Sequence, residues 1–209
     1  HLDIYGTKES MEEAFIEFTA GIKPTGMLVS KLGLKRGSEL KGPKKLRYHL
    51  RDNRADAYAE NISMHHGSYS FDVLVEKTKL KGFTLHMGGL HNIENIVAAI
   101  TIAHHLGIEE EKIKAAVAAF RGVKRRFEYI IKEAGLVYID DYAHHPEELR
   151  ALIEGAKGLF PDLHCTLIFQ PHLFTRTRDF ADEFAAVLNI PDETYLLPIY
   201  PAREKPIAG

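Results

Sequence analysis

Two apolar runs that each end in a cluster of polar side chains constrain the fold of this chain most. The first run, residues 135–139, leads into Asp140-Asp-Tyr-Ala-His-His-Pro146, and the second, residues 165–169, leads into Gln170-Pro-His-Leu-Phe-Thr-Arg-Thr-Arg178. A helical stretch separates them, and the two strands of such a βαβ unit run parallel. Both clusters should therefore meet at one sheet edge, where open α/β folds bind ligands. Carboxylates, histidines and arginines are costly to desolvate for packing alone, so we expect a site with anionic partners.

The hydrophobic periodicity predicts an α/β protein in two parts. In the first part we expect helices over residues 10–21, 91–106 and 109–120 and strands over 27–30, 46–49, 58–64, 68–76 and 82–87. In the second part we expect strands over 127–131, 136–140, 163–169 and 193–197 and helices over 146–160 and 178–188, which indicates a largely parallel sheet. We place a domain boundary near residue 122, where basic residues cluster.

The first expected helix has a recognisable start and a candidate buried face. Ser10 and Glu13 have the spacing of a capping box, with Ser10 as the N-cap residue. Phe15, Phe18 and Ile22 recur at helical spacing and are expected to form the stripe that packs against the core.

Composition excludes several classes of protein. The formal net charge of −2 argues against binding nucleic acid through bulk electrostatics. No apolar stretch approaches the roughly 20 residues that a membrane-spanning helix needs, so we expect no membrane insertion. One cysteine, Cys165, cannot form a disulfide within the chain, and a cytoplasmic location is the default expectation. The chain starts without methionine and ends in a loop-like segment, so we expect a fragment of a longer protein; its oligomeric state is not indicated.

Candidate nucleotide-binding residues follow a pair of glycines in the first part. Gly88 and Gly89 precede a helix whose first turn carries His91, Asn92 and Asn95. The two asparagines are three residues apart and share a helix face, and amides can pair with both the donor and the acceptor groups of a purine. The alternative is that Asn92 merely caps the helix.

The basic cluster at residues 124–126 could bind phosphate, because arginine pairs with phosphate oxygens in a bidentate manner. A solvated basic turn is the alternative. In the second part, Asp140 and Asp141 at a strand end are suited to ribose hydroxyls or a metal. Ligand spacing gives only weak support to a transition-metal site formed by His144, His145 and His172.

His144 is better interpreted as a substrate contact, given its place at the sheet edge. Arg176 could bind a carboxylate or phosphate, whereas Arg178 with Asp179 could be a surface ion pair. The chain contains no Gly-x-x-x-x-Gly-Lys-[Ser/Thr] phosphate loop and no Gly-x-Gly-x-x-Gly fingerprint.

Taken together, several motifs resemble the Mur ligases of bacterial peptidoglycan synthesis, in particular those that join L-alanine to UDP-N-acetylmuramate. The matching stretches are His1-Leu-Asp-Ile-Tyr5, Gly89-Leu-His-Asn-Ile-Glu-Asn95, Gly122-Val-Lys-Arg-Arg-Phe127, Asp140-Asp-Tyr-Ala-His-His-Pro146, Phe169-Gln-Pro-His172, Thr175-Arg-Thr177 and Tyr200-Pro-Ala202. The resemblance implies a three-domain enzyme. Residues 1–122 would be the C-terminal part of its central ATP-binding domain, and residues 123–209 the N-terminal part of its Rossmann-like C-terminal domain.

The resemblance also implies cofactors, substrates and residue roles. ATP and Mg²⁺ would convert the muramate carboxylate to an acyl phosphate, which the alanine amine attacks. The implied roles are Mg²⁺ binding for His1, ATP binding for His91, Asn92, Asn95, Arg126 and Asp141, catalysis for His144 and Arg176, and substrate contact for Tyr142, His144, His172 and Arg176. The fragment alone is expected to be inactive.

Two departures from the family pattern bear on specificity. Leu173 stands where many members have arginine, so Arg176 or Arg178 would carry more of the carboxylate contact. Ala143 stands where members usually have glycine. A related ligase that recycles murein tripeptide is the first alternative, although Gln170-Pro-His172 favours the alanine-adding enzyme because the recycling enzyme tends toward Glu-Pro-Arg there. A nucleotide-binding module without catalysis is the second alternative.

Overall fold

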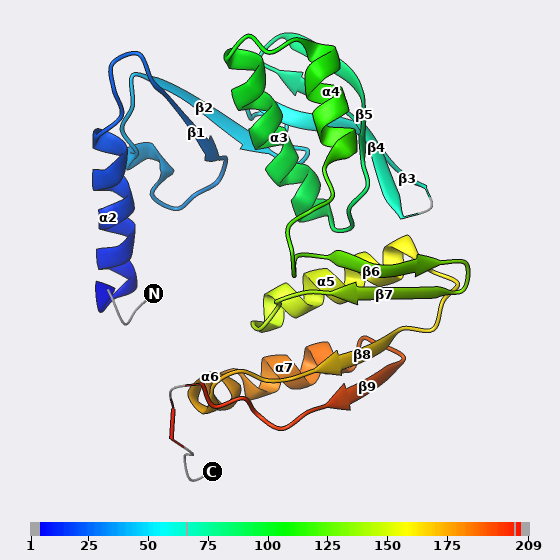
Figure 1. Cartoon of the computed structure of the whole chain (residues 1–209). Helices are drawn as coiled ribbons and strands as arrows, with labels where there is room; N and C mark the ends of the chain where they lie inside the picture. The colour runs from blue at the N-terminus through cyan, green and yellow to red at the C-terminus, as the bar shows by residue number, and fades with distance from the viewer. Residues whose placement is uncertain (1–4, 66, 203, 206–209) are drawn as a thin grey trace. The chain divides into compact units, whose positions relative to one another are not determined.

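The computed structural model describes residues 5–65, 67–202 and 204–205. His1, predicted to bind Mg²⁺, lies outside the described residues. The chain divides into two compact units, which are described separately (Figure 1). The first unit comprises the residues up to 63 with 70–85 and 91–119, and the second comprises 64–69, 86–90 and the residues from 120 onward. The domain boundary predicted near residue 122 stays a prediction.

A five-stranded sheet forms the centre of the first unit. Its strands lie in chain order: β1 (Met27–Lys31), β2 (Lys44–His49), β3 (Ala57–His65), β4 (Ser68–Val75) and β5 (Thr78–Leu85). β1 pairs with β2, and β2 with β3, in parallel. β4 is also a sheet neighbour of β3 and of β5, and only two residues separate it from each, a spacing that is typical of antiparallel strands. Alternate residues of β4 are buried, which explains why period-two patterning predicted this strand well.

Two helices cover this sheet and contribute its core. α3 (Leu90–His105) and α4 (Glu110–Ala119) lie side by side against the sheet (Figure 1). Their buried residues recur at three- and four-residue spacing, which places them on one face of each helix. These residues are Ile93, Val97, Ile100 and Thr101 of α3 and Ile113 and Val117 of α4.

The helix near the N-terminus, α2 (Lys8–Ala20), differs from its prediction in two respects. Its N-cap is Thr7, whose hydroxyl accepts the Ser10 N–H, so the capping box at Ser10 was wrong. The predicted buried stripe was also wrong, because Phe15 and Phe18 are 59% and 79% exposed.

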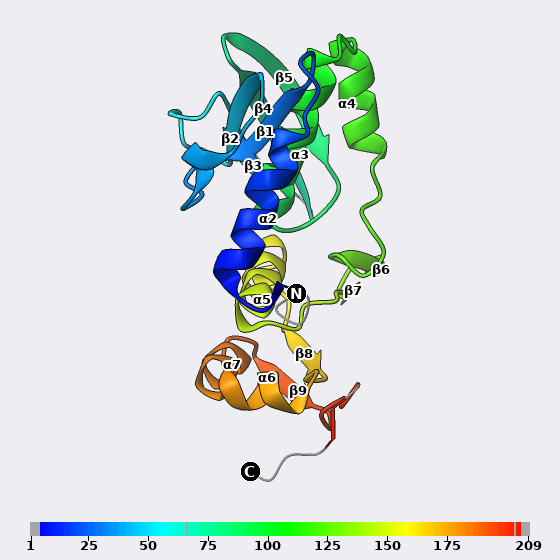
Figure 2. The ribbon, with the colours of Figure 1, turned by 90° about the vertical axis from the view of Figure 1, so that its left-hand side faces the viewer.

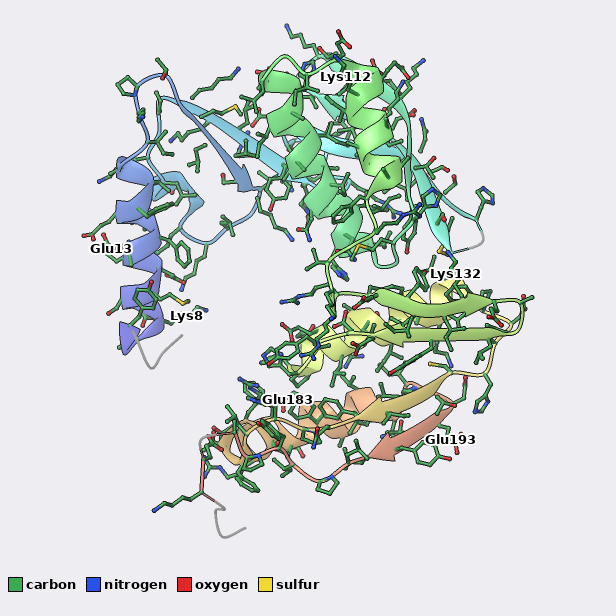
Figure 3. The ribbon with its side chains drawn as sticks, in the orientation of Figure 1. Lys8, Glu13, Lys112, Lys132, Glu183 and Glu193 are labelled. Carbon is green, nitrogen blue, oxygen red and sulfur yellow. The ribbon has the colours of Figure 1, made fainter. Side chains whose placement is uncertain are left out.

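Polar contacts decide which face of α2 is covered. Ile16 and Thr19 are the buried residues. The Thr19 hydroxyl accepts the Lys41 N–H at 2.8 Å, in the loop that follows the short 3₁₀ helix η1 (Gly37–Glu39). Arg36 beside η1 donates to Glu13 of α2 at 2.7 Å (Glu13 is labelled in Figure 3). These contacts hold α2 by a face that the phenylalanines do not share.

The second unit contains two pairs of strands and three helices in its described residues. β6 (Glu128–Glu133) pairs antiparallel with β7 (Leu136–Asp140), and β8 (Thr166–Phe169) pairs parallel with β9 (Glu193–Leu196). α5 (Pro146–Leu159) follows β7, and α6 (Phe174–Asp179) and α7 (Ala181–Leu188) follow β8. Figure 2 shows α6 and α7 on one side of β8 and β9.

A hydrophobic cluster packs α5, β8 and α7 together. Its buried members are Leu149 and Ile153 of α5, Phe169 of β8, and Phe184 and Val187 of α7. The predicted helix over 178–188 was wrong at its start, because Phe180 leaves the helical conformation (φ −121°) and separates α6 from α7. The predicted α/β class with a mostly parallel sheet is confirmed. Among the described residues, no helix is long and apolar enough to cross a membrane.

Candidate functional site

Within the first unit, the first turns of α3 carry the predicted nucleotide contacts. His91 and Asn95 are exposed and Asn92 is half-buried. Asn92 is the third residue of the helix, so it is not the N-cap residue that the alternative interpretation required. Asn92 and Asn95 lie one turn apart and share a helix face. The two amides therefore lie next to each other on α3 of the first unit.

Asp141 in the second unit organises the backbone around it. Its Oδ2 accepts the Phe127 N–H at 2.7 Å and its Oδ1 accepts the Ala143 N–H at 2.7 Å. Arg125 and Phe127 both have positive φ, at +59° and +50°, which is an unusual conformation for bulky residues. The carboxylate holds this strained segment beside the end of β7. Any contact of Asp141 with ribose would use its remaining lone pairs.

The strained segment also presents Arg126. This side chain lies between the two residues with positive φ and is exposed. An exposed guanidinium beside an ordered backbone can bind phosphate oxygens in a bidentate manner. The phosphate contact of Arg126 stays a prediction.

His144 has a defined tautomer in the second unit. Its Nδ1 lies 2.9 Å from the carbonyl oxygen of Tyr142, which can only accept, so Nδ1 carries the proton. When the ring is neutral, Nε2 is then an acceptor. Glu148, in the first turn of α5, accepts the backbone N–H groups of His144 and His145 at 3.0 and 3.3 Å. These bonds and the charge of His144 hold the pKa of Glu148 below its usual range despite partial burial.

His172 and Arg176 come from the segment that follows β8. The ring of His172 lies 6.3 Å from that of His144 and stacks on Tyr200 at 5.6 Å. One guanidinium nitrogen of Arg176 lies 3.5 Å from Nδ1 of His172. Burial, followed by the charges of Arg176 and His144, lowers the pKa of His172 and favours its neutral form. The two polar clusters predicted to meet are therefore brought together, but not at one sheet edge as predicted, because among the described residues β7 and β8 belong to separate two-stranded sheets.

Glu204 fixes the start of α6. Its carboxylate accepts the Thr175 N–H at 3.0 Å and also the Thr175 hydroxyl. These two bonds lower the pKa of Glu204. Leu173 just before α6 has φ +74°, a strained conformation for a branched side chain. The segment that bears Arg176 is thus held in one geometry from outside the helix.

Sequence reasoning missed some residues of this second-unit cluster as participants. Glu148 could have been found, because it is the third residue of a helix that begins after His145. Glu204 had no signal, since its partner Thr175 is 29 positions away. Tyr200 was seen only as part of a motif, and its stacking on His172 came from the fold.

A cavity of the second unit adjoins this cluster. A cavity of about 930 Å³ is lined by β7, α5 and β8, with Tyr142, His144 and His172 among its lining residues. Arg176 is permanently charged, whereas His172 tends to be neutral. Among the described residues no group of three or more histidine, cysteine or acidic side chains could hold a metal ion, so the weak transition-metal interpretation gains no support.

The comparisons with known proteins agree with this architecture. The model of the Mur ligase middle domain matches residues 1–103, and that of the Mur ligase glutamate ligase domain matches residues 125–208. The chain belongs to the Mur ligase family.

Two similar proteins share one name. A UDP-N-acetylmuramate–L-alanine ligase of Parabacteroides distasonis is 47% identical over the whole chain, and one of Porphyromonas gingivalis is 41% identical. The chain covers 45% and 46% of these relatives, so it spans slightly less than half of their length.

Solved structures show the same resemblance. The UDP-N-acetylmuramate–alanine ligase MurC of Thermotoga maritima matches 96% of this chain and 44% of its own, with a TM-score of 0.79 and 27% identity. A murein peptide ligase of Psychrobacter arcticus matches 90% of this chain and 40% of its own, with a TM-score of 0.56 and 26% identity.

Proposed function

We propose that the complete protein is an ATP-dependent ligase that joins L-alanine to UDP-N-acetylmuramate. The observation that carries the proposal is the cluster of His144, His172 and Arg176 at the ends of β7 and β8. This cluster combines a fixed cation with an imidazole nitrogen able to accept a proton. The names of the relatives that match the whole chain support the choice of substrates.

In this proposal each candidate residue has one role in substrate binding or catalysis. His91, Asn92 and Asn95 contact the adenine of ATP, Arg126 contacts its phosphates and Asp141 its ribose. Arg176 binds a carboxylate of the acceptor region, with Tyr142 and His172 beside it. Nε2 of His144 accepts the proton that the attacking amine must lose.

The proposal includes the wider expectations from the sequence. Residues 1–122 would belong to the central ATP-binding domain and residues 123–209 to the C-terminal domain. Mg²⁺ would be bound with the help of His1, and the reaction would take place in the cytoplasm.

A substrate comparison tests the proposal. We expect the complete gene product to release phosphate from ATP when UDP-N-acetylmuramate and free L-alanine are present together. His144→Gln should lower kcat by about 10²-fold or more, as expected for a residue that handles the transferred proton. Arg150→Gln, which removes a cation paired with Glu154 on α5, is the matched control and should stay near wild type. If only the murein tripeptide is consumed, the enzyme is the recycling ligase, and if neither is consumed a nucleotide-binding module remains.

A further inference from the structure

Glu94 ties three separate segments of the first unit together. Its Oε2 accepts from Lys31 Nζ at 2.7 Å, and its Oε1 accepts the Leu50 N–H at 3.1 Å. Lys31 is the last residue of β1 and Leu50 follows β2, so one carboxylate joins the ends of two parallel strands to α3. The Leu50 carbonyl accepts in turn from Ala59 in β3 at 2.9 Å.

The side chain of Glu94 is largely withdrawn from water, with 13% of it exposed. A carboxylate in that position needs its partners, because an unpaired buried charge is costly. Lys31 is 46% exposed, so the lysine can leave the pair more easily than the glutamate can. Glu94 is therefore the member that depends on the contact.

The position of Glu94 in the helix separates it from the amides. Residues two apart on a helix do not face the same way, so Glu94 points away from Asn92. It flanks the buried stripe of Ile93 and Val97 and leaves Asn95 exposed. Its two bonds thus fix the rotation of α3 about its axis without using the face that carries the asparagines.

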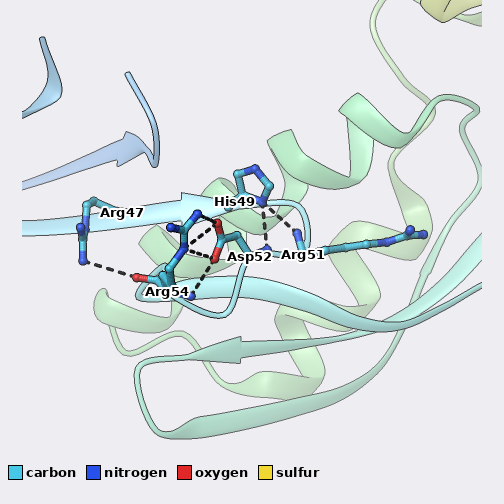
Figure 4. A network of polar contacts seen from close by, with 5 residues as sticks. All are labelled: Arg47, His49, Arg51, Asp52 and Arg54. Atoms are coloured by element: carbon cyan, nitrogen blue, oxygen red, sulfur yellow. Dashed lines mark hydrogen bonds and ion pairs between the residues drawn. The ribbon is translucent and has the colours of Figure 1, made fainter. Parts of the chain in front are cut away.

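The loop that Glu94 holds is itself ordered (Figure 4). His49 Nδ1 accepts the N–H groups of Arg51 and Asp52 at 3.1 and 2.9 Å. Asp52 accepts the Arg54 backbone N–H and its guanidinium, each at 3.0 Å. These bonds to Arg54 keep the pKa of Asp52 far below its usual range. The carboxylate of Glu94 therefore connects the helix to a loop with little freedom.

We infer that Glu94 is a positioning residue for the bound nucleotide, because it holds the Asn92–Asn95 face of α3 in register with the ends of β1 and β2. The inference rests on the proposed function, in which this face contacts the base. Ligands of open α/β folds bind at the carboxyl ends of parallel strands, where this contact lies. A helix start held in place before binding loses less freedom when the base arrives.

Kinetics of the complete gene product test the inference. We expect Glu94→Ala to raise the KM for ATP by about tenfold, with kcat and the KM of the other two substrates changed less than about threefold. Glu94→Gln keeps an acceptor for Leu50 but loses the charge opposite Lys31, so its KM for ATP should lie between wild type and Glu94→Ala. If Glu94→Ala does not fold, Glu94→Gln carries the test.

A second ion pair in the same sheet provides the matched control. Lys79 of β5 and Glu60 of β3 are also 2.7 Å apart, and neither belongs to α3. Glu60→Ala should leave the KM for ATP within about twofold of wild type. Equal changes in all three KM values for Glu94→Ala, or an unchanged KM for ATP, would show that Glu94 only supports the fold and would overturn the inference.

Direct binding separates this inference from the proposed function. If the protein does not ligate L-alanine, calorimetric titration of wild type and Glu94→Ala with ATP still tests the role of Glu94. Binding that weakens about tenfold supports the inference whatever the reaction is, and unchanged binding refutes it.

Discussion

Gly88 shows how one missing methyl group shapes the second unit. A Cβ atom at this position would overlap the ring of Phe127, which is almost fully buried. The ring cannot withdraw, because Tyr129 and Gly155 pack against it. The segment before α3 therefore approaches Phe127 as closely as it does only because residue 88 lacks a side chain.

We expect Gly88→Ala to reduce the free energy of unfolding by about 1–3 kcal/mol or more, the usual cost of overpacking a core. Urea denaturation measures this loss. Gly158→Ala is the control, since a Cβ there meets nothing within 4 Å and the position lies in α5. In a helix this change should be neutral or stabilise by up to about 1 kcal/mol. Equal behaviour of both variants would contradict the packing argument.

His105 near the end of α3 makes stability depend on pH. Burial, followed by the charge of Lys44, lowers its pKa, and the charge of Glu76 opposes this only in part. Its Nε2 is buried without a hydrogen bond among the described residues, although Glu76 lies 3.5 Å away. Because the folded pKa lies below the unfolded value of about 6.5, protons bind preferentially to the unfolded chain.

This difference in pKa decides how the free energy of unfolding changes with pH. Stability should be fully present above about pH 6.5 and should fall as the pH drops below that value. Urea midpoints between about pH 7.5 and 5 measure the slope, which His105→Gln should reduce. His172 has a lowered pKa for similar reasons, so part of the slope should remain. A slope that His105→Gln leaves unchanged would rule out its role.

At the scale of elements, the sequence predicted what depends on local periodicity. The strand over Ser68–Val75 and the helix over Pro146–Leu159 were found within about one residue, because burial alternates with a fixed period in each. The buried face of α2 could not be predicted. It depends on the contact of Thr19 with Lys41, which lies 22 positions away, and helical spacing alone would equally have allowed Phe15 and Phe18 to be buried.

In the candidate site, too, features set by local sequence could be predicted, whereas contacts between residues far apart in the chain could not. The meeting of His144 with His172 followed from the direction of βαβ strands and needed no contact to be known. The two hydrogen bonds of Asp141 could not be predicted. The Phe127 N–H reaches the carboxylate because Arg125 and Phe127 itself adopt positive φ, which the sequence pattern does not indicate. The sequence pattern thus located the polar cluster, whereas the fold determined which of its groups already form hydrogen bonds within the protein.

Asp141 connects the segment before β6 to the segment after β7, so its loss should lower the stability of the protein. Each of its oxygens accepts a backbone N–H, one before β6 and one after β7. Asp141→Asn replaces one acceptor with an NH₂ group facing a donor, so we expect a loss of about 1–3 kcal/mol in the free energy of unfolding. Thermal and urea unfolding of the chain measure it. Asp140→Asn is the control, because the Asp140 side chain makes no hydrogen bond within the described residues. A larger loss in the control would contradict this assignment.

At the scale of the whole molecule, the identified groups divide between two units, and neither contains a phosphate loop. The first unit has the α3 face with Asn92 and Asn95, and the second has Arg126, His144 and Arg176. Backbone N–H groups of a glycine-rich loop normally provide most of the affinity for the triphosphate. These 209 residues contain no such motif, so their contacts would be limited to the base, the ribose and single cations.

The 209-residue chain should therefore bind Mg-ATP weakly. We expect calorimetric titration to give a Kd weaker than about 100 μM, since a few exposed polar contacts rarely exceed about 5–6 kcal/mol of binding free energy. Asn95→Ala should weaken this residual binding further if the α3 face contributes to it. Arg51→Ala, a change in the neighbouring loop that leaves the backbone bond to His49 in place, is the control and should have little effect. A Kd of about 1 μM or tighter would mean that the chain contains a phosphate-binding arrangement that its motifs do not reveal.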